Sequence, residues 1–261
     1  WLMCAMRGPY AMASASATSK RRILVLGGWS PGPLHKMQAE MREVDFDEPD
    51  IPMPPKGLRW CCNPFWVALL LYIGIGPPIV MDRASSMASS VFGVVAMVLI
   101  GIFSLAVLRF LVAGIVWFAI RDGMRITEQR IKEVQPDAIV AFSWGGGVAC
   151  WLLASGRWSG PTLLLAPALS AMRSIACGGP RRLPEPHDGA PVHVFHAMHD
   201  AFCPDSQAHE FELAGCKVHR CNDDHILCRS VREISQTLRQ VLEAQAQQTM
   251  GAGRGIAAAI T

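Results

Sequence analysis

The stretch Ala141-Phe142-Ser143-Trp144-Gly145 decides the fold of this chain. It ends the segment 137–142 (DAIVAF), whose apolar residues after Asp137 predict a buried β-strand. It also opens a segment rich in Gly, Ala and Leu that predicts a helix over 145–155. A sharp turn between a strand and a helix needs small residues two positions before and two positions after its central residue. Ala141 and Gly145 meet this need, so the turn is expected to lift the Ser143 hydroxyl clear of the sheet. A capping serine in an ordinary turn is the alternative.

The sequence on both sides of this turn alternates between strand-like and helix-like segments. Apolar residues at helical spacing follow Leu34, and Glu128 and Lys132 support a helix over 123–134 as an i,i+4 pair. A long amphipathic helix is marked by Ile226 and Leu242 near the C-terminus. Such alternation predicts an α/β fold with a mostly parallel sheet flanked by helices. The expected strands cover 23–26, 44–51, 137–142, 162–165, 192–195 and 218–221, and 168–190 is expected to be a Gly- and Pro-rich connection.

Two polar motifs follow later strands. His196-Ala-Met-His-Asp200-Ala-Phe-Cys-Pro204 comes after the strand at 192–195, and Asn222-Asp-Asp-His225-Ile-Leu227 comes at the expected start of the last helix. With the turn at Ser143, these motifs resemble the α/β-hydrolase superfamily. The turn is similar to the family's G-x-S-x-G nucleophile elbow, with Ala141 in place of the first Gly. The segment from His196 to Pro204 is similar to the family's H-G-x-x-D-x-x-x-P motif, with Ala197 in place of Gly. The candidate groups also occur in the family's order of serine, acid and histidine.

The resemblance implies a role for each of these residues. Ser143 is the expected nucleophile, His225 the general base and acid, and Asp200 the acid that orients the imidazole. Asp223 or Asp224 would replace Asp200 only in an unusual local arrangement. The resemblance also implies an oxyanion site at the turn Leu26-Gly27-Gly28-Trp29, formed by the backbone N–H groups of Trp29 and Trp144, with Gly28 as a weaker candidate. The usual His-Gly pair is absent there.

The sequence predicts no cofactor and no metal. The glycine turn at 27–28 lacks the G-x-G-x-x-G pattern of a dinucleotide site. His193, His196 and His199 are spaced by three, but on a strand and the loop after it they are not expected to converge on an ion. The formal net charge of +3 (24 basic and 21 acidic residues) also argues against nucleic acid as a partner.

One apolar insert carries the hydrophobic excess of the chain. Residues 65–120 contain three charges, Asp82, Arg83 and Arg109, although hydrophobic residues make up 51% of the whole sequence and charged residues 17%. A helix needs about 20 apolar residues to span a bilayer. The stretch 84–108 meets this length, whereas 65–81 is borderline and its Pro77-Pro78 pair is expected to kink or end a helix. We therefore predict an inserted two-helix transmembrane hairpin, with buried core helices as the alternative.

The strands at 23–26 and 137–142 lie on opposite sides of the insert in sequence but are expected in one sheet. The chain must then return to the side it left, so the insert crosses the bilayer twice or not at all. Basic residues flank the globular side of the insert (Lys56, Arg59, Arg121 and Arg125), and Asp82 and Arg83 cancel in the expected distal turn. The positive-inside rule then predicts a globular domain on the cytosolic, stromal or matrix side. Trp60, Trp66 and Trp117 fit an interfacial belt or ordinary packing.

The predicted domains are a hydrolase domain over 22–56 and 121–246, a membrane hairpin over 57–120 and a flexible tail over 247–261. The acid-poor, Ser-rich and basic segment 1–21 resembles the remnant of an organelle transit peptide, or is a disordered extension. An organellar membrane is thus expected, mitochondrial inner or chloroplast. Nine cysteines without a C-x-x-C pair indicate free thiols in a reducing compartment. Cys61 and Cys62, beside the insert, are alternatively sites of acylation.

Two functional hypotheses follow from these features. The first is a membrane-anchored serine hydrolase that cleaves an ester or thioester, with membrane lipid as a partner. The second is a structural accessory subunit of a respiratory or photosynthetic membrane complex, with other membrane subunits contacting the hairpin over 65–120. The second is motivated by the transit-like N-terminus, by the two-pass insert and by Arg109, which is costly to place in lipid without a partner.

Overall fold

The computed structural model describes residues 20–54, 63–87, 91–176, 178–179 and 190–259. Six parallel strands form one sheet in the order β2-β1-β3-β4-β5-β6. β1 and β3 are adjacent, with Leu26 in register with Ala141, although the insert separates them in sequence. This pairing confirms that the strands on both sides of the insert belong to one sheet. The strands are β1 (Arg21–Leu26), β2 (Val44–Asp47), β3 (Ala138–Phe142), β4 (Thr162–Leu165), β5 (Val192–Ala197) and β6 (Lys217–Cys221).

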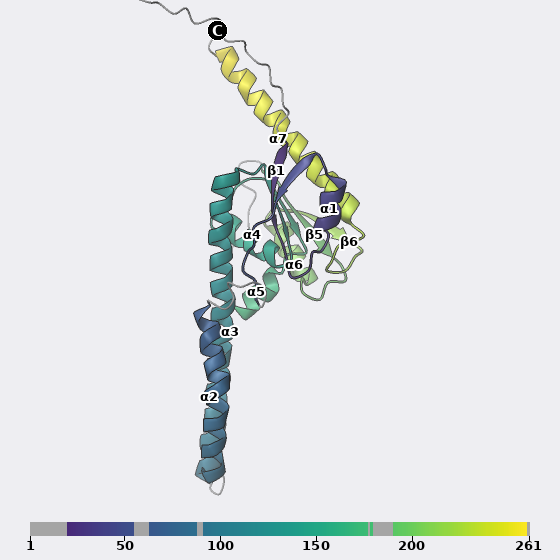
Figure 1. Ribbon diagram of the computed structural model, residues 1–261. Helices are drawn as coiled ribbons and strands as arrows, with labels where there is room; N and C mark the ends of the chain where they lie inside the picture. Colours follow the sequence, from purple (N-terminus) through teal and green to yellow (C-terminus); the bar gives the residue numbers. More distant parts are fainter. Residues whose placement is uncertain (1–19, 55–62, 88–90, 177, 180–189, 260–261) are drawn as a thin grey trace, which may run out of the picture.

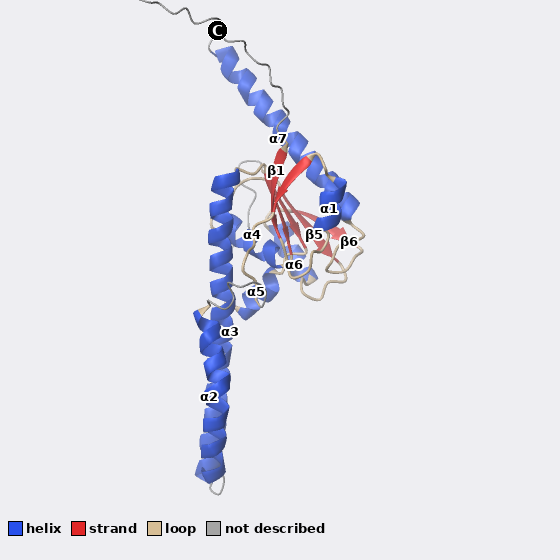
Figure 2. Cartoon of the chain, viewed as in Figure 1, coloured by secondary structure: helices blue, strands red, loops and turns tan. Residues whose placement is uncertain are grey.

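Helices cover both faces of the sheet (Figures 1 and 2). Successive strand residues point to opposite faces, so Ile23 packs with α1 (Leu34–Glu40) and α7 (Val231–Ala259), while Leu24 faces the other layer. That layer contains α4 (Trp144–Ala154), α5 (Leu169–Ile175) and α6 (Asp205–Leu213), together with part of α3 (Val91–Val134). Two buried hydrophobic cores therefore sandwich the sheet. The predicted α/β class with a mostly parallel sheet flanked by helices is confirmed.

The boundaries of several elements differ from those expected. β2 ends at Asp47 and not at residue 51, α5 lies inside the expected connection 168–190, and α6 was not predicted. α7 begins at Val231 and continues to Ala259, into the range expected to be a flexible tail. The missed helices are short, so they present too few apolar residues for a helical period to stand out in the sequence.

The insert forms two helices, α2 (Pro64–Met87) and α3, which lie side by side and project from the rest of the molecule (Figure 1). The Tyr72 hydroxyl donates a hydrogen bond to the Ser104 carbonyl at 3.2 Å between them. Asn63 caps α2 by accepting from the Phe65 N–H at 3.0 Å, and its side-chain amide donates to the Ile115 carbonyl on α3. Pro64, the first helical residue, needs no N–H acceptor at this position.

The helices of the insert run further than the sequence predicted. α2 continues through Pro77-Pro78, which were expected to kink or end it, and through Asp82 and Arg83, which were expected in the distal turn. α3 is a single 44-residue helix that passes Arg109 and replaces the separate helix expected over 123–134. Its part from Val116 onward packs against the sheet, with Val116, Ala119 and Ile120 in the core. The carboxyl-terminal part of α3 is thus part of the globular core.

Within the described residues, one helix, Gly93–Val134, is long and apolar enough to cross a membrane. Pro64–Ile75 is apolar but shorter. The predicted two-helix transmembrane hairpin is therefore not confirmed, although the helical hairpin itself is present. The predictions that concern residues 1–19, Lys56, Arg59, Trp60, Cys61 and Cys62 lie outside the described residues.

Candidate active site

Ser143 occupies a strained turn between β3 and α4. Its φ is 51° and its ψ is −112°, in a region that non-glycine residues rarely adopt. The Gly145 N–H donates to the Gly27 carbonyl at 3.1 Å, which ties the turn to the end of β1. A Cβ atom at Gly145 would lie 2.2 Å from the Leu26 carbonyl oxygen, so only glycine fits there. The sequence indicated that a small residue is needed two positions after Ser143, and in the structure the close approach of β1 is what requires Gly145 there.

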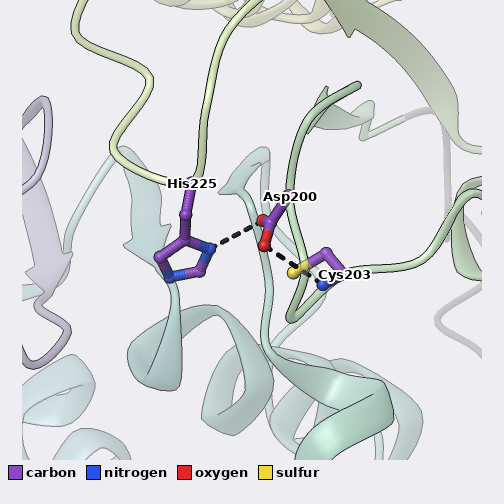
Figure 3. Close-up of side chains that lie close together, drawn as sticks. All are labelled: Asp200, Cys203 and His225. Carbon is purple, nitrogen blue, oxygen red and sulfur yellow. Dashed lines mark hydrogen bonds and ion pairs between the residues drawn. The ribbon is translucent and has the colours of Figure 1, made fainter.

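Three side chains from three loops form one hydrogen-bonded chain. His225 Nε2 lies 2.8 Å from Ser143 Oγ, and His225 Nδ1 lies 2.6 Å from Asp200 Oδ2. Figure 3 shows the imidazole of His225 directed toward the Asp200 carboxylate. Ser143 follows β3, Asp200 follows β5 and His225 follows β6, so all three lie at the carboxyl edge of the parallel sheet. His225 was expected at the start of the last helix; it lies in the loop before α7 instead.

The Asp200 side chain is fully buried and held by hydrogen bonds. Burial alone would raise its pKa, but the hydrogen bond with His225 and the bond from the Phe202 N–H, at 2.7 Å, outweigh burial and lower the pKa. The Cys203 N–H donates to the same carboxylate oxygen as Phe202, at 3.3 Å. Asp200 is therefore held as a carboxylate, the form that can orient an imidazole and stabilise its positive charge.

Asp223 and Asp224 shape the loop that carries His225. Asp223 Oδ2 accepts hydrogen bonds from the backbone N–H groups of Arg229 and Ser230 and from the Ser230 hydroxyl. Asp224 Oδ1 accepts from the Ile226 N–H at 2.9 Å. The contact to the imidazole thus belongs to Asp200, and these two carboxylates hold the backbone around His225.

The residues expected to supply the oxyanion donors, Trp29 and Trp144, are both near the turn that carries Ser143. Trp144 is the first residue of α4, so its N–H has no acceptor within the helix. Trp29 and Trp144 line the same cavity as Ser143 and His225. A Cβ atom at Gly28 would lie 2.8 Å from the Ser143 Cβ, so the turn after β1 approaches the serine closely because Gly28 lacks a side chain.

A cavity of about 370 Å³ adjoins Ser143 and is mostly apolar. Its polar side chains are those of Ser30, Ser143 and His225. The remaining wall consists of Trp29, Trp144, Ala168, Ala171, Met172, Ile175 and Phe202.

The strand order and the loops that carry these groups decide the fold family. The serine sits on a strained elbow after a central strand, and the acid and the histidine follow from later strand ends in the order Ser, Asp, His. The chain has the α/β-hydrolase fold. This confirms, at the level of the fold, the resemblance seen in the sequence.

Comparisons with solved structures agree with this fold. The chain is similar to TT1662 from Thermus thermophilus, with a TM-score of 0.50 and 15% identity over 86% of this chain and 90% of that one. It is also similar to a Xanthomonas campestris pv. campestris protein assigned to the alpha/beta hydrolase superfamily (TM-score 0.48, 13% identity, 86% and 99% covered). A third similar structure is esterase PE8 (TM-score 0.46, 12% identity, 85% and 93% covered). No family model matches the sequence. No curated protein matches it either.

Among the residues that the structure describes, one group of side chains has the composition of a metal site. Ligand atoms of Asp200, Cys203 and His225 lie within 4.8 Å of one another (Figure 3). However, the Asp200–His225 hydrogen bond occupies both of those groups, and Cys203 Sγ donates to the Pro167 carbonyl at 3.0 Å. Burial raises the pKa of the Cys203 thiol well above its ordinary value, whereas a metal binds the thiolate. This donor set does not fit a metal ion.

The three histidines spaced by three have separate partners. His193 Nδ1 lies 3.0 Å from His219 Nε2, and His199 Nε2 lies 2.9 Å from Asn222 Oδ1. His196 is buried, with Nε2 3.6 Å from an Asp205 carboxylate oxygen. The three rings thus pair with different residues and not with one another.

Sequence reasoning missed the side chains that pack on the imidazole. The ring centroid of Phe202 lies 5.2 Å from that of His225, and the Phe142 centroid lies 5.4 Å from it. Both aromatic rings therefore pack close to the imidazole of His225. Phe142 and Phe202 both stand within the motifs that carry Ser143 and Asp200, but the spacing of a motif does not indicate where an aromatic ring points.

Proposed function

We propose that this chain is a membrane-anchored serine hydrolase that cleaves an ester or thioester. The observation that carries the proposal is the hydrogen-bonded chain from Ser143 through His225 to Asp200, with 2.8 Å and 2.6 Å between the paired atoms. Hydrolases and esterases among the structures of similar fold agree with this reaction class.

In the proposed reaction, His225 Nε2 accepts the Ser143 proton as Ser143 Oγ attacks the substrate carbonyl carbon. The backbone N–H groups of Trp29 and Trp144 then stabilise the oxyanion, with Gly28 as a weaker candidate. The imidazolium protonates the leaving alcohol or thiol as the tetrahedral intermediate collapses to an acyl-enzyme. Water, deprotonated by His225, attacks the acyl-enzyme, and the acid product leaves as Ser143 regains its proton.

The membrane anchor in the proposal is the hairpin of α2 and α3. Arg109 lies 18 residues after Val91, the first residue of α3. At about 1.5 Å per residue this part of the helix is about 27 Å long, close to the roughly 30 Å thickness of the hydrocarbon layer of a bilayer. Large apolar side chains along this part are exposed, among them Leu99, Phe103 and Leu105. An exposed apolar surface of this kind favours lipid as its neighbour. By the positive-inside rule we place the globular domain on the cytosolic, stromal or matrix side of an organellar membrane.

Arg109 bears on the alternative role as a subunit of a membrane complex. Its guanidinium donates a hydrogen bond to the Ser174 carbonyl of α5, so the chain itself supplies a partner for this charge. The need for a second subunit, which Arg109 suggested in the sequence, is thereby reduced. We therefore favour the hydrolase.

Hydrolysis by the full chain in detergent micelles tests the proposal. We expect release of nitrophenol from a nitrophenyl ester, and a Ser143→Ala variant with the same thermal unfolding curve should lose the activity. Equal rates for the wild type and Ser143→Ala would contradict the assignment of Ser143.

A further inference from the structure

The active-site cavity extends along one face of α5. Ala168, Ala171, Met172 and Ile175 line it, and their spacing of i, i+3, i+4 and i+7 places them on a single helical stripe. The Ala168 N–H donates to the Ser143 carbonyl at 2.9 Å, so this stripe begins at the serine. It ends at Ile175, which is exposed. The cavity is thus an apolar passage from Ser143 to the outer end of α5.

The outer end of α5 lies against the hairpin. Ser174, next to Ile175 in sequence, accepts the hydrogen bond from Arg109 on α3. Arg109 lies near the base of the hairpin, where Leu111 and Ile115 of α3 pack with Leu69 of α2. Figure 1 shows α5 beside α3 close to the level at which α2 begins. The end of the passage therefore lies where the hairpin leaves the globular domain.

The rim of the site is apolar as well. Trp29, Phe202 and Ile175 line the cavity and are exposed. Met198 and Ile226 are exposed as well, on the loops that carry Asp200 and His225. The loops at this edge lie on the side of the domain from which the hairpin projects (Figure 2). A cluster of exposed apolar side chains around a cavity is typical of a surface that meets a membrane or a ligand.

From these observations we infer the substrate class of the proposed hydrolase. We propose that the substrate is a long-chain acyl ester that resides in the bilayer, and that its acyl chain enters from the base of the hairpin along α5. The ester carbonyl then lies at Ser143 and the chain lies against Ala171 and Met172. The inference rests on the proposed function for the reaction, whereas the route of the acyl chain is a binding property that can be tested without turnover.

Photocrosslinking in a catalytically silent protein tests the route. The Ser143→Ala protein is reconstituted in phosphatidylcholine vesicles that contain a phosphatidylcholine with a diazirine in the half of one acyl chain nearest its carbonyl. We expect adducts on Met172, which is only 1% exposed and is reached from inside the cavity, as well as on the hairpin. Ala171→Trp in the same protein should remove the Met172 adducts and leave those on the hairpin. Adducts confined to the hairpin would overturn the inference.

A matched control excludes a general effect of adding tryptophan. Ala154 is exposed at the end of α4 and lies outside the cavity. Ala154→Trp should keep the Met172 adducts at the level of the Ser143→Ala protein. If Ala154→Trp removes them as fully as Ala171→Trp does, the loss does not come from filling the passage and the inference fails.

Kinetics of the otherwise unmodified chain separate this inference from the proposed reaction. The ratio of the rates for a dodecanoyl and an acetyl nitrophenyl ester should fall at least tenfold in Ala171→Trp and stay within twofold in Ala154→Trp. An unchanged ratio in Ala171→Trp would refute the acyl route even if both esters are cleaved. Met172 adducts without hydrolysis of either ester would support the route while contradicting the proposed reaction.

Discussion

The hydrogen bond between His225 Nδ1 and Asp200 Oδ2 determines which imidazole nitrogen faces Ser143. With Asp200 as a carboxylate, Nδ1 carries a proton and Nε2 is free to accept one from the serine. Asn at this position can donate to Nδ1 and so favours the wrong tautomer. We expect Asp200→Asn to lower kcat by roughly 10⁴-fold with a much smaller change in KM, measured on a nitrophenyl ester.

Asp205→Asn provides the control for this change. Asp205 is an exposed carboxylate at the start of α6, outside the hydrogen-bonded chain, and its replacement should leave kcat within about twofold. If Asp200→Asn retained more than a tenth of the wild-type kcat, another group would have to orient the imidazole.

The sequence indicated the three proposed reacting residues, but it did not indicate which side chains pack around them. Ser143, Asp200 and His225 stand in short motifs whose spacing follows from the loops after parallel strands, so their convergence could be predicted. The aromatic contacts of Phe142 and Phe202 with His225 depend on side-chain directions that no spacing encodes. The Arg109 contact with Ser174 joins positions 65 residues apart and has no local signal in either segment.

At the scale of elements, β5 carries two histidines whose pKa values are lowered. Burial is the main cause for His193, and the neighbouring His219 and Lys217 lower its pKa further, to about 4. In the unfolded chain His193 takes up a proton as the pH falls below about 6.5, whereas in the folded chain it stays neutral until the pH approaches 4. The contribution of neutral His193 to stability is therefore complete above pH 6.5 and is lost as the pH falls toward 4.

His193→Gln should reduce this acid sensitivity. Thermal unfolding between pH 7.5 and 4.5 should show a smaller fall in Tm for His193→Gln than for the wild type. His209→Gln serves as the control because the His209 side chain is largely exposed, and its Tm curve should parallel that of the wild type. Identical curves for all three proteins would show that His193 does not account for acid destabilisation.

Element types were easier to predict than element ends. Buried strands such as β3 and β4 stand out as short apolar runs, bounded by Asp137 and Ser143 in the first case and by prolines in the second. The length of α2 could not be predicted, because a Pro pair normally ends a helix, whereas α2 continues through Pro77-Pro78 to Met87. The continuity of α3 was not predicted either, because the sequence turns from apolar to charged at Arg121 and Asp122, where the insert was expected to end.

At the scale of the whole molecule, we propose that the hairpin of α2 and α3 lies in lipid and anchors the domain that carries Ser143. Leu99 and Phe103 are exposed on α3 midway along the hairpin. A charge at the centre of a membrane helix costs about 2.5–3.5 kcal/mol on insertion scales. The double variant Leu99→Asp/Phe103→Asp should therefore shift the protein from the membrane pellet to the soluble fraction after alkaline extraction.

Leu213→Asp is the matched control for the double variant. Leu213 is an exposed apolar residue on α6, in the globular domain, and its replacement should leave the protein in the pellet. Wild-type protein in the soluble fraction, or a double variant that pellets as the wild type does, would contradict the membrane anchor.

Covalent labelling of the serine tests the central claim most directly. Membranes that contain the full chain are treated with a fluorophosphonate, and the modified residue is mapped by mass spectrometry. The account predicts one adduct, on Ser143, which is lost in Ser143→Ala and strongly reduced in His225→Ala. A folded protein that shows no adduct on Ser143, or that is labelled equally in Ser143→Ala, would contradict it.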